Sequence, residues 1–163
     1  MRGVYTLIIR FLFPCSFNIG KCLSARLDEG TYLYTGSGLG LGSTSLEGRI
    51  RRHLRQEKRT FWHIDWILAC KQAEVRAVVL AESEHNAECR VNEVLLKDQS
   101  ISVRVKGIGS SDCVCASHFL AFSRSTRLAA QVVKSCYESL GLAPRVLTFG
   151  HLRGRVRISS SQR

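Results

Sequence analysis

The sequence predicts an α/β domain, a small mixed or antiparallel β-sheet flanked by helices, followed by a C-terminal helical extension. Short runs rich in β-branched and aromatic residues fill the first third of the chain. From residue 44 onward, stretches with apolar residues at helical spacing alternate with further strand-like runs. A chain of 163 residues is long enough for one compact domain with its own core.

The first third is expected to hold three short strands joined by turns, as in an antiparallel meander. Residues 4–13 form the first strand, residues 17–23 a second extended piece with Gly20 in a bend, and residues 30–36 the third. Side chains alternate along a strand, so Tyr32 and Tyr34 share one face, opposite Leu33.

The first helix is expected over residues 44–58. Thr44 followed by Glu47 fits a capping box at its start. Arg49 and His53 are four residues apart and share a face of this helix. The buried stripe beside them repeats every fourth residue: Leu46, Ile50 and Leu54.

Later segments continue the alternation of helix and strand. Helices are expected over residues 60–72, 83–97 and 127–140, and strands over 75–81, 101–105, 118–122 and 145–149. Residues 106–117 form a Gly/Ser loop, and the basic, Ser-rich residues 151–163 are expected to be partly disordered. This pattern predicts a main domain over residues 1–123 and a C-terminal helix with a basic tail over 124–163.

The charge of the chain points to a polyanionic partner. Lys and Arg total 24 against 13 acidic residues, which gives a formal net charge of +11. Nucleic acid is the first partner to consider, because neutralising phosphates releases condensed counterions; an anionic membrane or a generally basic surface is the alternative. Four cations of the first helix are expected to meet the phosphate backbone, unless they are only a solvated face: Arg51, Arg52, Arg55 and Lys58.

The seven cysteines are odd in number and are not spaced as a disulfide framework. Five of them lie among apolar neighbours and are interpreted as small packed thiols: Cys15, Cys22, Cys70, Cys89 and Cys136. No signal peptide is apparent, and no apolar run is long enough to span a bilayer. These features predict a cytoplasmic protein with reduced cysteines.

Cys113, Cys115 and His118 form a dense group of soft metal ligands. With Cys89 or His63 as a fourth ligand, the group could hold zinc tetrahedrally. The alternative is a loop of packed thiols with a hydrogen-bonded His118.

Two tyrosines on neighbouring strands, facing a helix with arginine and histidine, make a plausible phosphodiester-cleaving site. A tyrosine base at neutral pH needs a pKa well below its usual value of about 10, and a nearby arginine and a metal shift the pKa in that direction. The glycine-rich residues 36–42 match no nucleotide-binding register and are interpreted as a flexible turn from strand to helix.

The chain resembles the GIY-YIG nuclease family over residues 3–122. The segments GVY at 3–5 and YTG at 34–36 look like its two namesake motifs, and LEGRI at 46–50 looks like the helix that carries its catalytic arginine. FWHIDW at 61–66 and GSSDCVCASH at 109–118 resemble a Uri-like branch of small archaeal and bacterial proteins. AECR at 87–90 matches the segment of the metal-binding acid, with Glu88 in that position, although Glu84 and Glu93 are alternatives.

The resemblance implies a divalent-metal-dependent endonuclease acting on DNA, branched or damaged DNA included, with RNA also open. Tyr5 would be the general base, Tyr34 would orient water or phosphate, and Arg49 would clamp the phosphate. His53 and His63 would assist proton transfer or position the phosphate. Glu88 would bind one Mg²⁺ or Mn²⁺ ion.

Each site residue also has a structural interpretation. The tyrosines could be half-buried strand aromatics, Arg49 and His53 could lie on a solvated helix face, and His63 could pack between two tryptophans. The asparagine found late in many family members has no clear counterpart here, which favours a non-catalytic nucleic-acid-binding module. A zinc-stabilised interaction domain is the third hypothesis.

Overall fold

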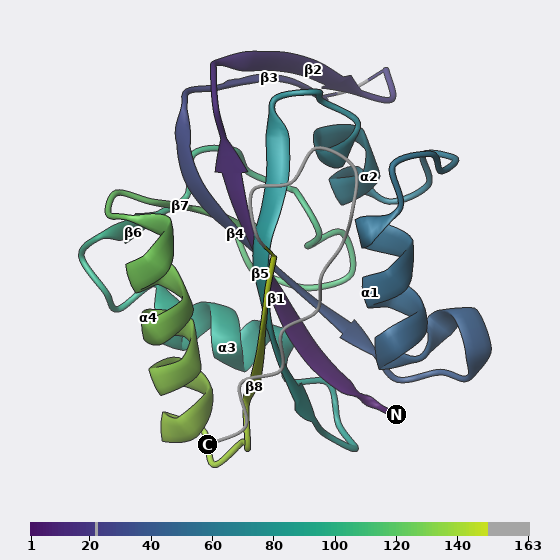
Figure 1. Ribbon diagram of the computed structural model, residues 1–163, viewed down its shortest axis with the longest axis vertical. Coiled ribbons are helices and arrows are strands. Elements are labelled where there is room, and N and C mark those ends of the chain that lie inside the picture. Colours follow the sequence, from purple (N-terminus) through teal and green to yellow (C-terminus); the bar gives the residue numbers. More distant parts are fainter. Residues whose placement is uncertain (22, 150–163) are drawn as a thin grey trace.

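The computed structural model describes residues 1–21 and 23–149, and an antiparallel six-stranded sheet forms its centre, in the order β6-β7-β4-β1-β5-β8 (Figure 1). The α/β class predicted from the sequence is therefore confirmed. The strands of this sheet are β1 (Gly3–Phe11), β4 (Gly30–Gly38), β5 (Ala73–Glu82), β6 (Ile101–Ser102), β7 (Phe119–Phe122) and β8 (Arg145–Thr148). The helices are α1 (Leu46–Leu54), α2 (His63–Leu68), α3 (Glu88–Leu95) and α4 (Thr126–Ser139), with a 3₁₀ turn at Gly42–Thr44.

Strand β1 lies in the middle of the sheet because its apolar run can be buried on both faces. All of its residues except Arg10 are buried, and it pairs with β4 on one side and β5 on the other. In the β1–β4 register Tyr5 lies opposite Gly36 and Leu7 opposite Tyr34. The two tyrosines therefore lie on adjacent strands, as the sequence predicted.

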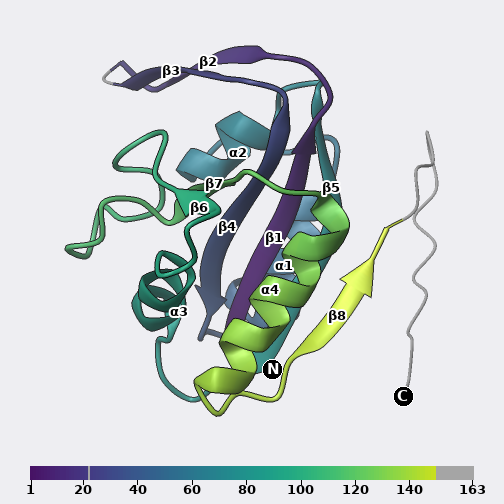
Figure 2. The ribbon, with the colours of Figure 1, turned by 90° about the vertical axis from the view of Figure 1, so that its left-hand side faces the viewer.

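Two helical layers cover the two faces of the sheet. Helices α1 and α2 pack on the face that carries Tyr5, Tyr32 and Tyr34. Helices α3 and α4 pack on the opposite face, which carries Leu33 and Val4 (Figure 2). The predicted separation of Tyr32 and Tyr34 from Leu33 is thus confirmed.

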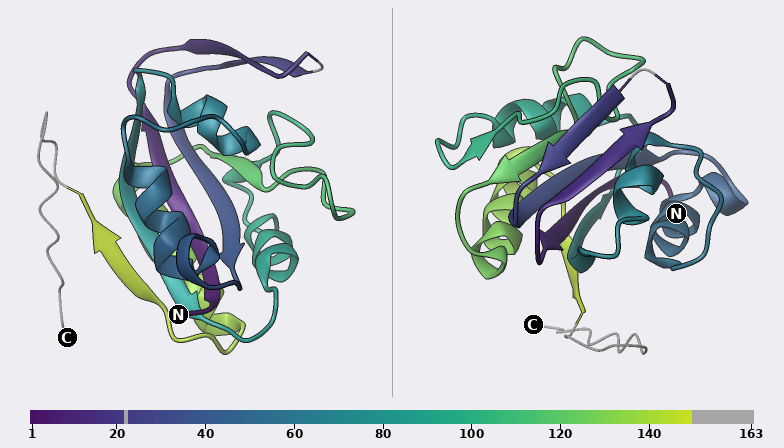
Figure 3. Two further views of the ribbon diagram at one scale, coloured as in Figure 1. Left: turned by 90° about the vertical axis from the view of Figure 1, so that its right-hand side faces the viewer. Right: turned by 90° about the horizontal axis from the view of Figure 1, so that it is seen from above.

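The segment between β1 and β4 differs from the predicted meander. Strands β2 (Cys15–Ile19) and β3 (Leu23–Leu27) form a separate two-stranded sheet at one end of the molecule (Figure 3). A disulfide joins Cys15 at the start of β2 to Cys70 beyond α2, so the prediction of reduced, packed thiols is wrong for this pair. Sequence spacing missed it because the two cysteines are 55 residues apart and meet only in the folded chain.

Three of the helices, α1, α2 and α3, are shorter than the sequence predicted, whereas α4 has the predicted length, displaced by one residue. Ser45, not Thr44, caps α1: its hydroxyl accepts the N–H of Gly48, and the helix ends at Leu54. Helix α2 covers only residues 63–68. Helix α3 begins at Glu88, because Ser83 closes a local turn with His85 instead of capping the helix. None of the helices in the described part of the chain has the length and apolar content of a membrane-spanning segment.

The C-terminal segment contributes to both the core and the sheet. The predicted boundary at residue 123 falls in the connection between β7 and α4. Helix α4 buries Val133 and Tyr137 against the sheet, and the Tyr137 hydroxyl lies 3.0 Å from Oγ1 of Thr6 on β1. Strand β8 pairs with the edge of β5. Cys22 and the predicted disordered tail, residues 151–163, lie outside the described residues.

Candidate active site

A cavity of about 390 Å³ lies beside α1 and the start of α3. Strand β4 contributes one part of its wall, and the connection before β7 contributes another. The residues around it come from five separate segments of the chain: Tyr34, Gly36, Ser37, Arg49, Phe61, Trp62, His63, Asn86, Glu88, Gly109, Ser111 and Asp112. Four of the predicted site residues, Tyr34, Arg49, His63 and Glu88, therefore meet at one opening.

The open edge of β4 explains how the two helical layers reach the same cavity. Strand β7 pairs with β4 only as far as Tyr34, and one further backbone bond joins Thr35 to His118. Beyond that point no strand in residues 1–21 and 23–149 pairs with β4 on this side. The Glu88 carboxylate, from α3, lies near this edge, where the side chain and the backbone of Ser37 help to lower its pKa.

Tyr5 lies directly behind the cavity wall. Its side chain is 1% exposed, and its hydroxyl lies 2.7 Å from Nε2 of His53. Its ring covers Gly36, where an added Cβ would stand 2.5 Å from the Tyr5 hydroxyl. Glycine at position 36 thus makes room for the tyrosine of the neighbouring strand.

His53 is a buried residue of the site, not a residue of a solvated helix face. It is 3% exposed, and its second ring nitrogen, Nδ1, lies 3.8 Å from Oδ1 of Asp65. Asp65 accepts hydrogen bonds from Arg52 at 2.6 Å and from the backbone N–H groups of Phe61 and Trp62 at 3.0 Å each. Tyr5, His53, Asp65 and Arg52 thus form one row of polar groups, which runs from the buried Tyr5 behind the cavity wall to the partly exposed Arg52.

The charges along this row of polar groups follow from its contacts. Burial alone would raise the pKa of Asp65, but His53, Arg52 and the two backbone donors together lower it, so Asp65 is a carboxylate. Burial lowers the pKa of His53 below 6.5, with Asp65 opposing, so the imidazole is neutral at pH 7. Its single proton belongs on Nδ1, toward Asp65, which leaves Nε2 to accept the Tyr5 hydroxyl proton.

The pKa values of both site tyrosines run against the sequence prediction. Burial raises the pKa of Tyr5, with a further contribution from Tyr34, and the nearby Arg49 opposes this only in part. Burial and the Glu88 charge also raise the pKa of Tyr34. Arg49 shifts the pKa of the phenols downward, as expected, but desolvation raises it by more. Both phenols therefore carry their protons at neutral pH in this structure.

Arg49 is held in place by an aromatic ring. Its guanidinium carbon lies 4.6 Å from the centre of the Trp62 ring, with that of Arg52 at 4.8 Å. Its Nε is buried and has no hydrogen-bond partner within residues 1–21 and 23–149. A cation at the cavity wall with donor capacity left over is suited to bind an anionic group of a ligand.

Of the three candidate acids, only Glu88 lines the cavity. Glu84 is 77% exposed and pairs with Arg2, while Glu93 is exposed on the next turn of α3. Burial alone would raise the pKa of Glu88, but His118 and Ser37 lower it, so the group is ionised. An ionised carboxylate with Asp112 and the Asn86 amide on the same wall is a hard oxygen donor set of the kind that Mg²⁺ or Mn²⁺ binds.

His63 lines the cavity and does not merely pack between the tryptophans. Its Nδ1 accepts the backbone N–H of Gly109 at 3.3 Å. Because Nδ1 accepts this bond, the Nε2 side of the ring carries a proton that is available to a ligand.

The four basic residues predicted to bind nucleic acid divide into two pairs. Arg51 and Arg55 are exposed. Arg52 pairs with Asp65, and the Lys58 ammonium donates to the His53 carbonyl at 2.8 Å. Arg52 and Lys58, both partly exposed, thus also belong to the polar network around His53, and a contact of either with nucleic acid stays a prediction.

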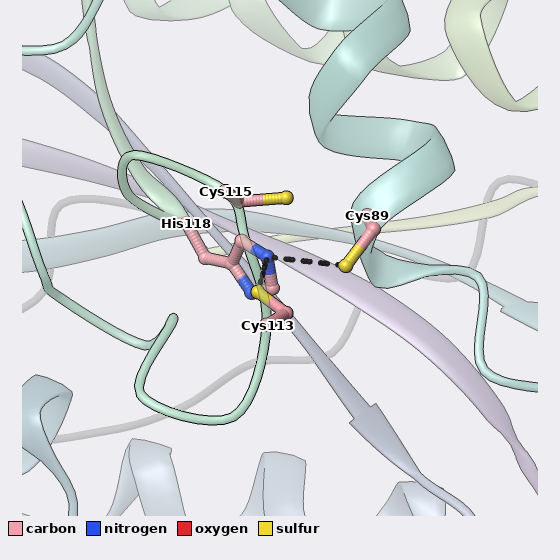
Figure 4. Close-up of side chains that lie close together, drawn as sticks. All are labelled: Cys89, Cys113, Cys115 and His118. Atoms are coloured by element: carbon pink, nitrogen blue, oxygen red, sulfur yellow. Dashed lines mark hydrogen bonds between the residues drawn. The ribbon is translucent and has the colours of Figure 1, made fainter.

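Cys89, Cys113, Cys115 and His118 come together beside the cavity (Figure 4). Their ligand atoms lie within 4.8 Å of one another, and the group could hold a metal ion. Of the two fourth ligands proposed from the sequence, Cys89 joins the group and His63 does not. Asn92, one turn further along α3, holds this loop by donating to the Ser117 carbonyl at 2.8 Å.

Sequence reasoning missed Asp65, Ser37 and Asn86. Asp65 is the third residue of α2, where an acid has an ordinary capping role, so its position along the chain did not mark it as part of a site. Nothing in the sequence singled out Ser37 or Asn86, because they occupy ordinary strand-end and loop positions. Their place at the cavity becomes visible only once the open edge of β4 is known.

One family model matches the chain over residues 4–142, and its description is "Domain of unknown function DUF123". No curated protein and no solved structure matches the chain.

Proposed function

The chain belongs to the DUF123 family, and from its site we propose that it is a divalent-metal-dependent endonuclease of the GIY-YIG type that hydrolyses DNA phosphodiester bonds. One observation carries the proposal. Tyr34, Arg49, His63 and Glu88 surround one cavity, and the Tyr5–His53 pair lies directly behind its wall. A cation, a carboxylate and a proton-accepting chain at one opening are what phosphodiester hydrolysis requires.

In the proposed reaction, Tyr5 and His53 act together as the base. The Tyr5 oxygen accepts a proton from the attacking water, while the original Tyr5 proton passes to Nε2 of His53, 2.7 Å away. This relay needs no free phenolate, so the raised pKa of Tyr5 is no obstacle. Asp65 stabilises the imidazolium that results.

Arg49 would bind the scissile phosphate, and Tyr34 would orient it or the attacking water. His63 would donate its Nε2 proton to a phosphoryl or leaving oxygen. Glu88 would hold one Mg²⁺ or Mn²⁺ ion, which when bound supplies charge neutralisation at the phosphoryl oxygens. Arg51 and Arg55 would contact the flanking backbone, a contact that carries no sequence information.

The net charge of +11 supports nucleic acid as the partner, with branched or damaged DNA and RNA within the same chemistry. The proposal includes zinc at the Cys/His cluster as a second metal and a cytoplasmic location. Four free thiols within the described residues support that location, while the Cys15–Cys70 disulfide does not.

A plasmid-nicking assay with Mg²⁺ or Mn²⁺ tests the proposal. Tyr5→Phe should slow cleavage by about 100- to 10,000-fold, because it removes the relay hydroxyl. Tyr32→Phe is the matched control: it lies on β4, and its hydroxyl donates only to the Asp28 carbonyl, away from the cavity. Equal rates in the wild type and both variants would contradict the assignment.

The dependence of cleavage on pH separates the relay from a free phenolate. The pKa of His53 lies below 6.5, so the proton acceptor is available once the pH exceeds it. The rate in a buffered Mg²⁺ assay should rise through acidic pH and level off by about pH 7. A rate that instead climbs steadily from pH 7 to 10 would show that the phenol itself must ionise.

A non-catalytic nucleic-acid-binding module is the second candidate. The low exposure of Tyr5 favours this second candidate, because the Tyr5 hydroxyl is packed against Gly36 and the attacking water would have to reach it there. This candidate is supported if binding to DNA weakens steeply with salt while no metal produces cleavage.

A further inference from the structure

The Cys/His cluster has the dimensions of a tetrahedral zinc site. Zn–S and Zn–N bonds of about 2.3 and 2.0–2.1 Å place neighbouring sulfur and nitrogen ligands about 3.6 Å apart. Nε2 of His118 lies 3.5 Å from Sγ of Cys113 and 3.7 Å from Sγ of Cys89. The Cys115 sulfur completes the group within 4.8 Å (Figure 4). Three thiols and one imidazole are soft ligands that suit zinc better than Mg²⁺.

The second ring nitrogen of His118 connects this cluster to the candidate active site. Nδ1 is buried, and Oε2 of Glu88 lies 3.4 Å from it. A carboxylate at this position keeps the ring proton on Nδ1 and leaves the Nε2 lone pair for a metal, an arrangement common around zinc. The neighbours Glu88 and Cys89 thus face opposite nitrogens of one imidazole.

We propose that one zinc ion bound by Cys89, Cys113, Cys115 and His118 fixes, through His118, the position of the Glu88 carboxylate in the cavity wall. The zinc site follows from the cluster alone, whereas its value for catalysis depends on the proposed function of Glu88. Zinc here is structural, because all four of its positions are taken by protein ligands.

The surrounding loop makes this role physically reasonable. Residues 103–118, between β6 and β7, contain no helix or strand, although loops longer than about 12–15 residues without such structure are uncommon. This loop supplies Gly109, Ser111 and Asp112 to the cavity wall. Gly109 has φ +71°, and an added Cβ would stand 2.8 Å from the Tyr34 ring. A bond from Cys113 to zinc would anchor this part of the wall to α3.

Elemental analysis of the 163-residue protein tests the site without using DNA. The wild type should carry about one zinc per chain and lose thermal stability when zinc is chelated. Cys113→Ser should lose the zinc. Cys136→Ser should keep it, because Cys136 is a buried free thiol on α4 outside the cluster. Zinc absent from the reconstituted wild type, iron in its place, or equal zinc in Cys113→Ser would overturn the site.

Zinc competition with a chromogenic chelator tests the connection to Glu88. Glu88→Gln should retain the four ligands but bind zinc about 10- to 100-fold more weakly. Glu84→Gln is the control, since Glu84 is exposed and pairs with Arg2. Equal zinc affinity in Glu88→Gln and the wild type would overturn the coupling. Because neither readout involves cleavage, a failure of the nuclease proposal shows separately, as a wild type that never nicks DNA.

Discussion

Replacing Arg49 by Ala should lower Mg²⁺-dependent DNA cleavage by about 100- to 1,000-fold, the usual loss when one preorganised donor to transition-state charge is removed. Arg49 is the cation at the cavity wall with a buried, unpartnered Nε among the described residues. Trp62 holds the guanidinium in place, so little ordering is needed at the moment of reaction. The measurement is the single-turnover rate on plasmid DNA.

The matched control for Arg49 is Arg127→Ala. It removes the same charge from an exposed position on α4, in the opposite helical layer, and should change the rate by less than about twofold. If both variants lost activity to the same small extent, Arg49 would be contributing only to the overall charge. Arg49→Lys should recover little activity, because an ammonium lacks the planar fork that grips two phosphate oxygens.

Replacing Asp65 by Asn should cost about 3 kcal/mol of the free energy of unfolding. Asp65 is fully buried, and Arg52 and two backbone N–H groups all donate to it. Removing one partner of a buried ion pair leaves the other charge uncompensated, which costs more than the pair itself contributes. Urea unfolding of the wild type and the variant, followed by circular dichroism, measures the difference.

Glu138→Gln is the control for Asp65. It neutralises the carboxylate of an ion pair with Lys134 on α4 in which both side chains are 50% exposed. Such surface pairs contribute about 0.3–0.5 kcal/mol. If Asp65→Asn proved as mild as this control, the row of polar groups from Tyr5 to Arg52 would not be holding α1 and α2 together.

The sequence by itself predicted the six strands of the central sheet, and it named four residues that the structure brings to one cavity: Tyr34, Arg49, His63 and Glu88. The period-two pattern placed Tyr32 and Tyr34 on one face, and spacing by four placed Arg49 and His53 on one side of a helix, because these properties depend on local backbone geometry alone. The same local reasoning identified Cys113, Cys115 and His118 as candidate metal ligands, and the structure brings them together.

Only the tertiary structure decided which of these residues meet and in what state of charge. The Cys15–Cys70 disulfide and the choice of Cys89 over His63 depend on where distant segments pack. Helix α3 reaches the tyrosine face only because β7 leaves the end of β4 open. The pKa of Tyr5 is raised because desolvation in the folded interior outweighs the nearby charge of Arg49. No spacing along the chain encodes that desolvation.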